Sequence, residues 1–166
     1  MLEIPISADM IERAERRARE MGILNKSFMK GQGNVVGFLG EEIVLAALPG
    51  SRLADDYNYD IEWEGARFEV KTKRTTASPL PYYMCSVSDH NTLQDTNNYI
   101  FCRVLSQNGM FTKGWVLGYI AKGDFFRRAR FMRKGEKEGD NGYIVKNDCW
   151  SVRIDELCPL SPCLSD

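Results

Sequence analysis

Apolar residues in the first third of the chain recur at helical spacing. From Ser7, a residue type that caps helices, they repeat every three or four positions as far as Met21, with arginines and glutamates between them. A second apolar stripe predicts a helix over residues 35–48. Gly37 and Gly40 lie inside it, and each costs a helix roughly 1 kcal/mol relative to alanine. We therefore expect another part of the molecule to pack very close to this helix.

The next segment alternates apolar and polar residues with period two, which is typical of strands. Residues 57–64 and 66–72 predict a β-hairpin whose turn is made by Glu64 and Gly65, because glycine tolerates the positive φ that a tight turn needs. Residues equally distant from this turn then face each other across the hairpin.

Two carboxylates meet in that register. Asp60 faces Glu69, and Lys71 follows two positions further along the same face of the sheet. Like charges in this geometry destabilise a sheet unless a cation lies between them. A hard divalent ion such as Mg²⁺ favours carboxylate oxygens, so the hairpin predicts a candidate cation site.

The rest of the chain predicts four more strands and one more helix. The strands fall at residues 82–87, 99–105, 115–120 and 143–154. A basic helix over residues 124–133 would begin at Asp124 as its cap. This order of elements indicates the α/β or α+β class, with a central mixed sheet flanked by helices.

The composition narrows the class of protein. The 166 residues are 43% hydrophobic and 27% charged, as in an ordinary globular protein of one domain. We expect a cytoplasmic location, because no apolar run is long enough to cross a membrane and the N-terminus lacks a secretory signal. Five cysteines without a CxxC pair and a single histidine, His90, favour reduced thiols over a disulfide framework or a zinc cluster. His90 itself is expected in a loop.

Charge is unevenly distributed, although the formal net charge is only −1. Residues 55–64 carry five acidic side chains and no basic one, whereas residues 122–137 carry seven basic side chains against two acidic ones. The first segment could hold a cation and the second a polyanion such as nucleic acid. The alternative for the basic segment is a solvated helix face.

Two short motifs carry a resemblance to a known family. The first is a D…ExK pattern in the predicted hairpin: Asp60, eight intervening residues, then Glu69, Val70 and Lys71. The second is a G-x-x-G-E pattern on the preceding helix: Gly37, Gly40 and Glu41. Over residues 31–74 the chain thus resembles the PD-(D/E)XK nuclease superfamily. Tyr59 stands in the place of the proline that gives the superfamily its name.

The resemblance implies an α/β fold with a restriction-endonuclease-like core, in which a central mixed β-sheet is flanked by helices. Residues 1–166 would form a single nuclease domain. Its parts would be an N-terminal helical extension (1–30), the catalytic helix and hairpin (31–74), and the remaining sheet, basic helix and C-terminal segment (75–166). The chain looks like a small member of the kind common in phages and among relatives of Holliday-junction resolvases and restriction enzymes.

The resemblance also implies roles for individual residues. Asp60, Glu69 and the backbone carbonyl of Val70 would ligate Mg²⁺, for which Mn²⁺ could substitute. Glu41 would reach the metal directly or through water. Lys71 would position the attacking water, help to deprotonate it and balance the charge that develops on the phosphate.

Alternatives stay open at two of these positions. Glu42 could take the role of Glu41, and Asp56 could take that of Asp60. His90 could assist catalysis, as a histidine does in some relatives of this kind.

The expected partner is DNA, which the chain would cut as an endonuclease. We expect neither an organic cofactor nor an association with a membrane. Relatives usually act as homodimers, because cutting two strands symmetrically takes two sites. Further candidate contacts to DNA are basic residues after the motif and on the basic helix: Lys73, Arg74, Arg127, Arg128 and Arg130. The rival interpretations are a nuclease fold that binds nucleic acid or a partner without catalysis, and a structural protein whose acidic hairpin is merely solvated.

Overall fold

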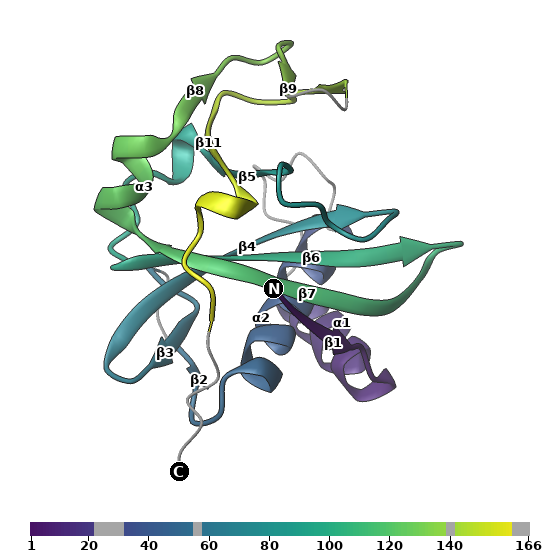
Figure 1. The fold of residues 1–166 in the computed structure, drawn as a ribbon. Coiled ribbons are helices and arrows are strands. Elements are labelled where there is room, and N and C mark those ends of the chain that lie inside the picture. Colours follow the sequence, from purple (N-terminus) through teal and green to yellow (C-terminus); the bar gives the residue numbers. More distant parts are fainter. Residues whose placement is uncertain (22–31, 55–57, 139–141, 161–166) are drawn as a thin grey trace.

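A six-stranded mixed sheet forms the centre of the structure, a computed structural model that describes residues 1–21, 32–54, 58–138 and 142–160. Its strands are β1 (Leu2–Pro5), β2 (Arg52–Leu53), β3 (Ile61–Trp63), β4 (Ala66–Thr75), β6 (Asn98–Gln107) and β7 (Met110–Ala121). They lie in the order β1-β7-β6-β4-β3-β2 (Figure 1). β4 and β6 run parallel, and the other neighbouring pairs are antiparallel. The predicted mixed sheet is confirmed.

Two helices cover one face of this sheet, α1 (Ala8–Met21) and α2 (Gln32–Ala47) (Figure 1). Ser7 caps α1 as predicted, since its Oγ accepts a hydrogen bond from the Met10 amide at 3.2 Å. α2 begins three residues earlier than the apolar stripe indicated. Leu39 and Ile43 on α2 are completely buried, and they share one apolar core with Val104 of β6. Burial of this stripe explains why α2 lies flat on the sheet.

A close approach explains one of the two glycines in α2. A Cβ atom at Gly40 would lie 1.8 Å from the Oγ1 of Thr72 on β4, so no side chain fits between helix and sheet there. At Gly37, by contrast, a Cβ atom would meet nothing within 4 Å. The expected close packing is therefore confirmed at Gly40 and wrong at Gly37.

The opposite face of the central sheet is covered by a second layer. This layer contains β5 (Met84–Ser88), α3 (Lys122–Arg128), β8 (Arg130–Met132) and β11 (Cys149–Arg153), with 3₁₀ turns at Asp89–Asn91 and Ile154–Glu156. β5, β11 and β8 form a three-stranded sheet in that order. Tyr99 of β6 packs against Phe125 of α3, with ring centroids 5.2 Å apart, in a second apolar core. Beyond this layer, β9 (Lys137–Glu138) and β10 (Tyr143–Ile144) pair as a short two-stranded arm.

The basic helix is shorter than the sequence predicted. α3 ends at Arg128, and Ala129 is extended, with φ −64° and ψ 137°. Residues 130–132 instead form the strand β8, which pairs with β11. The ring centroids of Phe131 and Trp150 lie 5.1 Å apart there. Pairing with a distant strand therefore overrides the helical pattern. The prediction that Asp124 caps the helix is also wrong, because Ala121 is the N-cap residue and Asp124 lies in the first turn.

Other strand boundaries also differ from the sequence pattern. The single strand expected at residues 143–154 is two strands, β10 and β11, which belong to different sheets. β1 and β2 were not predicted. β1 has only four residues, and it is held by pairing with β7 at the edge of the sheet.

The hairpin has the predicted turn and register. Glu64 and Gly65 both adopt positive φ, 49° and 77°, as a two-residue hairpin turn requires. Trp63 pairs with Ala66, and Ile61 pairs with Phe68. β3 is shorter than expected, however, because its ladder with β4 ends at Ile61. The candidate site begins where this ladder stops.

Candidate functional site

Asp60 lies at the open end of the β3–β4 hairpin, just beyond the last residue pair of the ladder. Its side chain makes a hydrogen bond to β4 where the backbone ladder has ended. Its amide donates to the carbonyl of Phe68 at 3.0 Å, and its Oδ2 accepts a hydrogen bond from the Val70 amide at 2.7 Å. The N–H and C=O of one strand residue point to the same edge. The carbonyl of Val70 therefore faces the same side as the Asp60 carboxylate. Two of the oxygen atoms that the resemblance assigned to Mg²⁺, those of Asp60 and of the Val70 carbonyl, thus point to the same edge.

Glu69 and Lys71 project from the face of β4 that is turned toward β5. The Nζ of Lys71 lies 2.7 Å from Oε1 of Glu69, whose side chain is buried. Gln94 completes this group, because its Nε2 donates to Glu69 Oε1 at 2.8 Å and its Oε1 accepts from Lys71 Nζ at 3.2 Å. Lys71 is thus held by two acceptors. Gln94 was not predicted, since a glutamine in a loop carries no recognisable pattern.

Glu41 enters the site from α2 and is bound by a residue of α1. Arg17 Nη2 lies 2.6 Å from Glu41 Oε2, and its guanidinium stacks 4.2 Å from the ring centroid of Phe38. Glu42, the alternative to Glu41, instead pairs with Arg13 at 2.7 Å. Arg17 was also not predicted. It lies on an amphipathic helix rich in arginine, where nothing in the sequence distinguishes it.

Neighbouring carboxylates raise the pKa values of Glu41 and Asp60. The pKa of Glu41 is raised to about 8, first by burial and then by the charge of Asp60, although Arg17 lowers it. The pKa of Asp60 is raised to about 6 by burial and then by the charge of Glu69, against the lowering effects of the Val70 amide and Lys71. Glu41 also responds to Glu69. This coupling favours Glu41 over Glu42 as a member of the site, and Asp56 lies outside the described residues.

The carboxylates do not form a closed metal cage. Within the described ranges, no group of three or more histidine, cysteine, aspartate or glutamate side chains is arranged to hold a metal ion. Glu41 and Glu69 instead contact Arg17 and Lys71. The donor chemistry still suits a hard divalent cation, because buried carboxylates with raised pKa values and a backbone carbonyl are oxygen ligands short of positive charge. Asp60, Glu41 and Val70 could hold such an ion, with Glu69 beside them.

The residues predicted to bind DNA divide between two faces. Lys73 shares the face of Glu69 and Lys71, and its Nζ donates to Ser86 Oγ at 2.8 Å. Arg74 projects to the opposite face, where its guanidinium lies 5.6 Å from the Phe111 ring centroid. The structure therefore groups Lys73, and not Arg74, with the candidate catalytic residues.

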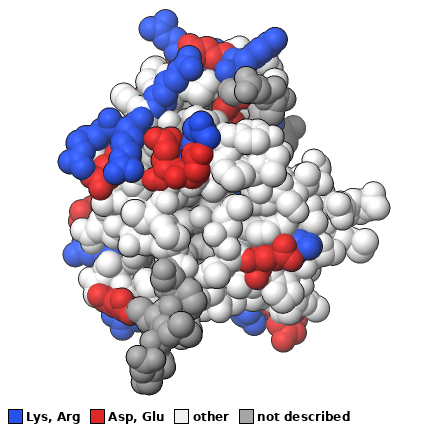
Figure 2. All heavy atoms as spheres, in the orientation of Figure 1, with Lys and Arg blue, Asp and Glu red and all other residues white. Residues whose placement is uncertain are grey.

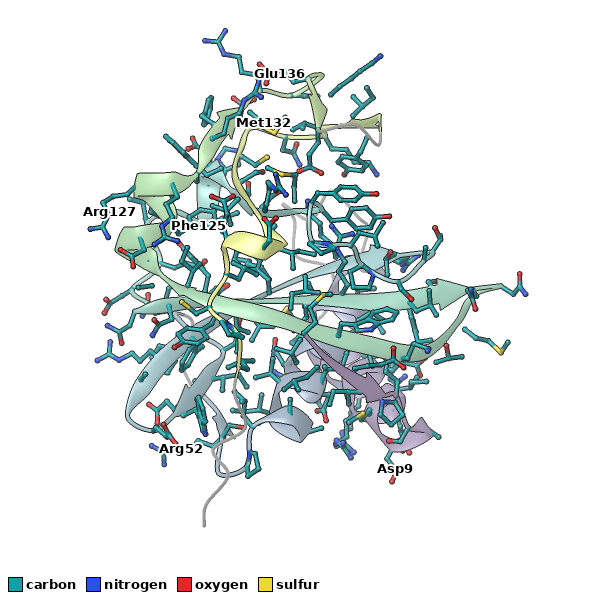
Figure 3. The ribbon with its side chains drawn as sticks, in the orientation of Figure 1. Asp9, Arg52, Phe125, Arg127, Met132 and Glu136 are labelled. Carbon is teal, nitrogen blue, oxygen red and sulfur yellow. The ribbon has the colours of Figure 1, made fainter. Side chains whose placement is uncertain are left out.

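The arginines of α3 and β8 form a mixed rather than a purely basic surface. Arg127 pairs with Asp124, and Arg128 donates to the carbonyl of Glu156 at 3.4 Å. Arg130 is exposed. Figure 2 shows basic and acidic side chains side by side over this region, and Figure 3 labels Arg127 there. These residues lie on the second layer, whereas Glu41 comes from the helical layer across the sheet.

His90 lies in an exposed 3₁₀ turn, as the sequence analysis expected for a loop residue. Its neighbour Asp89 accepts a hydrogen bond from Trp150 Nε1 at 3.0 Å, which ties the turn to β11. The structure therefore places His90 in a turn that is tied to β11.

Comparison with known proteins leaves the family open. No protein-family model matches the chain, and the search of curated proteins found no match either. No helix in the described part of the chain is long and apolar enough to cross a membrane. Any functional assignment therefore depends on the site itself.

Proposed function

We propose that this chain is a metal-dependent nuclease with a restriction-endonuclease-like core, and that it hydrolyses DNA phosphodiester bonds as an endonuclease. The observation that carries the proposal is the set of carboxylates gathered at the open end of the hairpin, of which Glu41 and Glu69 are buried and Asp60 is half-buried. Asp60 and Glu41 have raised pKa values, and Glu69 lies beside them with Lys71 at 2.7 Å. Carboxylates that destabilise one another in a metal-free protein are expected where a divalent cation binds.

The residues of the site suit this chemistry. A bound Mg²⁺ or Mn²⁺ would polarise the phosphate and lower the pKa of a bound water. The Val70 amide fixes the Asp60 carboxylate at the edge of β4. Glu69 and Gln94 hold the Lys71 ammonium by two hydrogen bonds, which positions it to bind the attacking water and to stabilise negative charge on the phosphate. The reaction needs neither a histidine nor a cysteine nucleophile.

A second candidate function is a binding module without catalysis. One observation favours it: Arg17 and Lys71 already neutralise Glu41 and Glu69 within the chain. A protein that never binds a metal would need such internal partners. A nuclease would need them only until the metal binds, so metal binding separates the two proposals.

The test uses supercoiled plasmid and a branched DNA, each incubated with Mg²⁺, Mn²⁺ or EDTA. The proteins are the wild type, Lys71→Ala and a matched control, Lys113→Ala, which removes a half-exposed lysine that pairs with Glu3. We expect metal-dependent cutting by the wild type and the control, and a loss of roughly a hundredfold or more in Lys71→Ala.

Three results would decide against parts of this proposal. Cutting in EDTA, or equal cutting by Lys71→Ala, would refute the assigned site. If neither DNA is cut and Mg²⁺ does not raise the melting temperature, the binding module is the better assignment.

Preference for the branched DNA would identify a resolvase-like substrate. Sedimentation with DNA bound would show whether the protein acts as a homodimer.

A further inference from the structure

Two adjoining cavities lie on the face of β4 that carries Glu69 and Lys71. They measure 210 and 160 Å³, and their linings share Lys73, Ser86 and Ser88. Lys71 lines the larger one, so the cavities extend the candidate site along β4 toward β5. Figure 1 shows that β9 lies above β5 on this side of the sheet.

The larger cavity has a polar part, formed by basic side chains and serine hydroxyls, and an apolar part that includes Met84, Phe101 and Leu117. Besides the two lysines it contains Arg103, whose Nη2 donates to the Met84 carbonyl at 3.1 Å and whose guanidinium stacks 5.1 Å from the Tyr83 ring centroid. Within the described part of the chain, the buried Nε of Arg103 has no hydrogen-bond partner. Basic groups gathered in a cavity with an unused N–H indicate a site for an anion.

A carboxylate of the chain itself lines the adjoining cavity. Glu138 of β9 is buried, and its Oε1 accepts hydrogen bonds from Ser86 Oγ at 3.0 Å and Lys73 Nζ at 3.4 Å. Ser151 Oγ donates to Ser86 Oγ at 2.7 Å, which orients the Ser86 hydroxyl toward Glu138. An ammonium and a hydroxyl that converge on one anionic oxygen would serve a phosphate oxygen equally well.

We propose that these cavities bind a phosphoryl group of the nucleic acid, next to the phosphate that is cut at Lys71, and that Glu138 holds the same donors until the substrate displaces it. Lys71 and Lys73 are two residues apart on one strand face, about 6.6 Å, which is close to the spacing of successive phosphates in an extended strand. The arm that carries Glu138 pairs over two residues on each strand and is held further by the Val145 backbone, which bonds Gly135 and Glu136, so only the Glu138 side chain has to turn away for the substrate to enter. The identity of the ligand rests on the proposed nuclease function, but the anion site does not.

The site is tested by titrating inorganic phosphate into the metal-free protein in EDTA, with binding followed by NMR. Glu138→Gln removes the competing charge and keeps the shape of the side chain. Glu136→Gln, two residues before Glu138 and labelled in Figure 3, is the matched control. We expect Glu138→Gln to bind phosphate roughly threefold to tenfold more tightly than the wild type, because one ion pair no longer competes. We expect Glu136→Gln to bind as the wild type does.

A second pair of variants tests the donors. Lys73→Met should weaken phosphate binding at least about tenfold, whereas Lys134→Met, an exposed lysine, should not; melting curves of all variants establish that they fold. Equal affinity in Glu138→Gln and Glu136→Gln, or unchanged binding in folded Lys73→Met, would overturn the proposal. Ser86→Ala, with the smallest change in volume, decides the matter if Lys73→Met does not fold.

Two short single strands then identify the phosphoryl group. One carries a 5′-phosphate and the other a 5′-hydroxyl, and both are measured in EDTA with the wild type and Glu138→Gln. Tighter binding of the phosphorylated strand assigns the site to a terminal phosphate, and equal binding assigns it to an internal one. If neither strand binds while inorganic phosphate does, the anion site stands and its assignment to nucleic acid falls. Because no metal is present, these results are independent of whether the chain cuts DNA.

Discussion

Replacing Asp60 with asparagine tests whether the carboxylates of the candidate site destabilise the metal-free protein. The pKa of Asp60 is about 6, compared with an ordinary value of 3.8, and this difference corresponds to about 3 kcal/mol when the group is ionised. Asparagine removes the charge but can still accept the hydrogen bond of the Val70 amide. Because an uncharged acceptor binds that amide less strongly, the expected gain is about 1–3 kcal/mol.

The sign of the pH dependence follows from the direction of the shift. A carboxyl group whose pKa is raised on folding binds more protons in the folded than in the unfolded protein, so ionising it costs stability. Stability should therefore fall as pH rises from about 4 to about 6 for Asp60, and the fall should continue to about 8 for Glu41. Asp60→Asn should equal the wild type near pH 3.5 and exceed it at pH 8.

The assay is urea denaturation in EDTA at several pH values, followed by the same measurement with Mg²⁺. Asp95→Asn is the matched control, because this exposed aspartate pairs with the Arg67 side chain at the surface. Mg²⁺ should stabilise the wild type and the control at pH 8, and should stabilise Asp60→Asn much less. The reasoning is refuted if Asp60→Asn is less stable than the wild type at pH 8 in EDTA, or if the difference between them does not change with pH.

Four further substitutions test separate parts of the structure. Gly40→Ala should lower the free energy of unfolding by about 1–3 kcal/mol, since its Cβ atom would meet Thr72. Gly37→Ala should raise the free energy of unfolding by up to about 1 kcal/mol, because its Cβ atom would meet nothing within 4 Å. Urea denaturation measures both. Gly65→Ala should cost about 1 kcal/mol because alanine is strained at φ 77°. Gln94→Leu should lower kcat about tenfold or more with little effect on stability, because Lys71 loses one of its two acceptors; equal kcat values would show that Glu69 alone holds Lys71.

The parts of the fold that the sequence predicted depend on short-range rules. Ser7 caps its helix from three residues away, and Glu64 with Gly65 sets the register of every pair in the hairpin. What the sequence did not predict depends on contacts between distant segments. Residues 130–132 continue a helical pattern in the sequence, yet they form a strand that pairs with β11, where Phe131 packs against Trp150.

The same division applies to the candidate site. Asp60, Glu69 and Lys71 could be named because a hairpin fixes which residues share an edge or a face. Arg17 and Gln94 could not, although each makes a contact of 2.6 to 2.8 Å with a site carboxylate, because they come from elements 24 and 25 residues away along the chain.

At Asp60 the structure differs from the pairing that the hairpin register predicted. An uninterrupted ladder would have placed Asp60 directly opposite Glu69, but the ladder ends at Ile61 and the Asp60 carboxylate binds the Val70 amide instead. That change turns the side chain from the face of the sheet to its edge, where the carbonyl of Val70 also points. A regular hairpin would leave the two carboxylates facing each other, whereas the opened one places an anionic and a neutral oxygen donor side by side. If the chain binds a cation as proposed, the early end of β3 is what brings these two donors to the same edge.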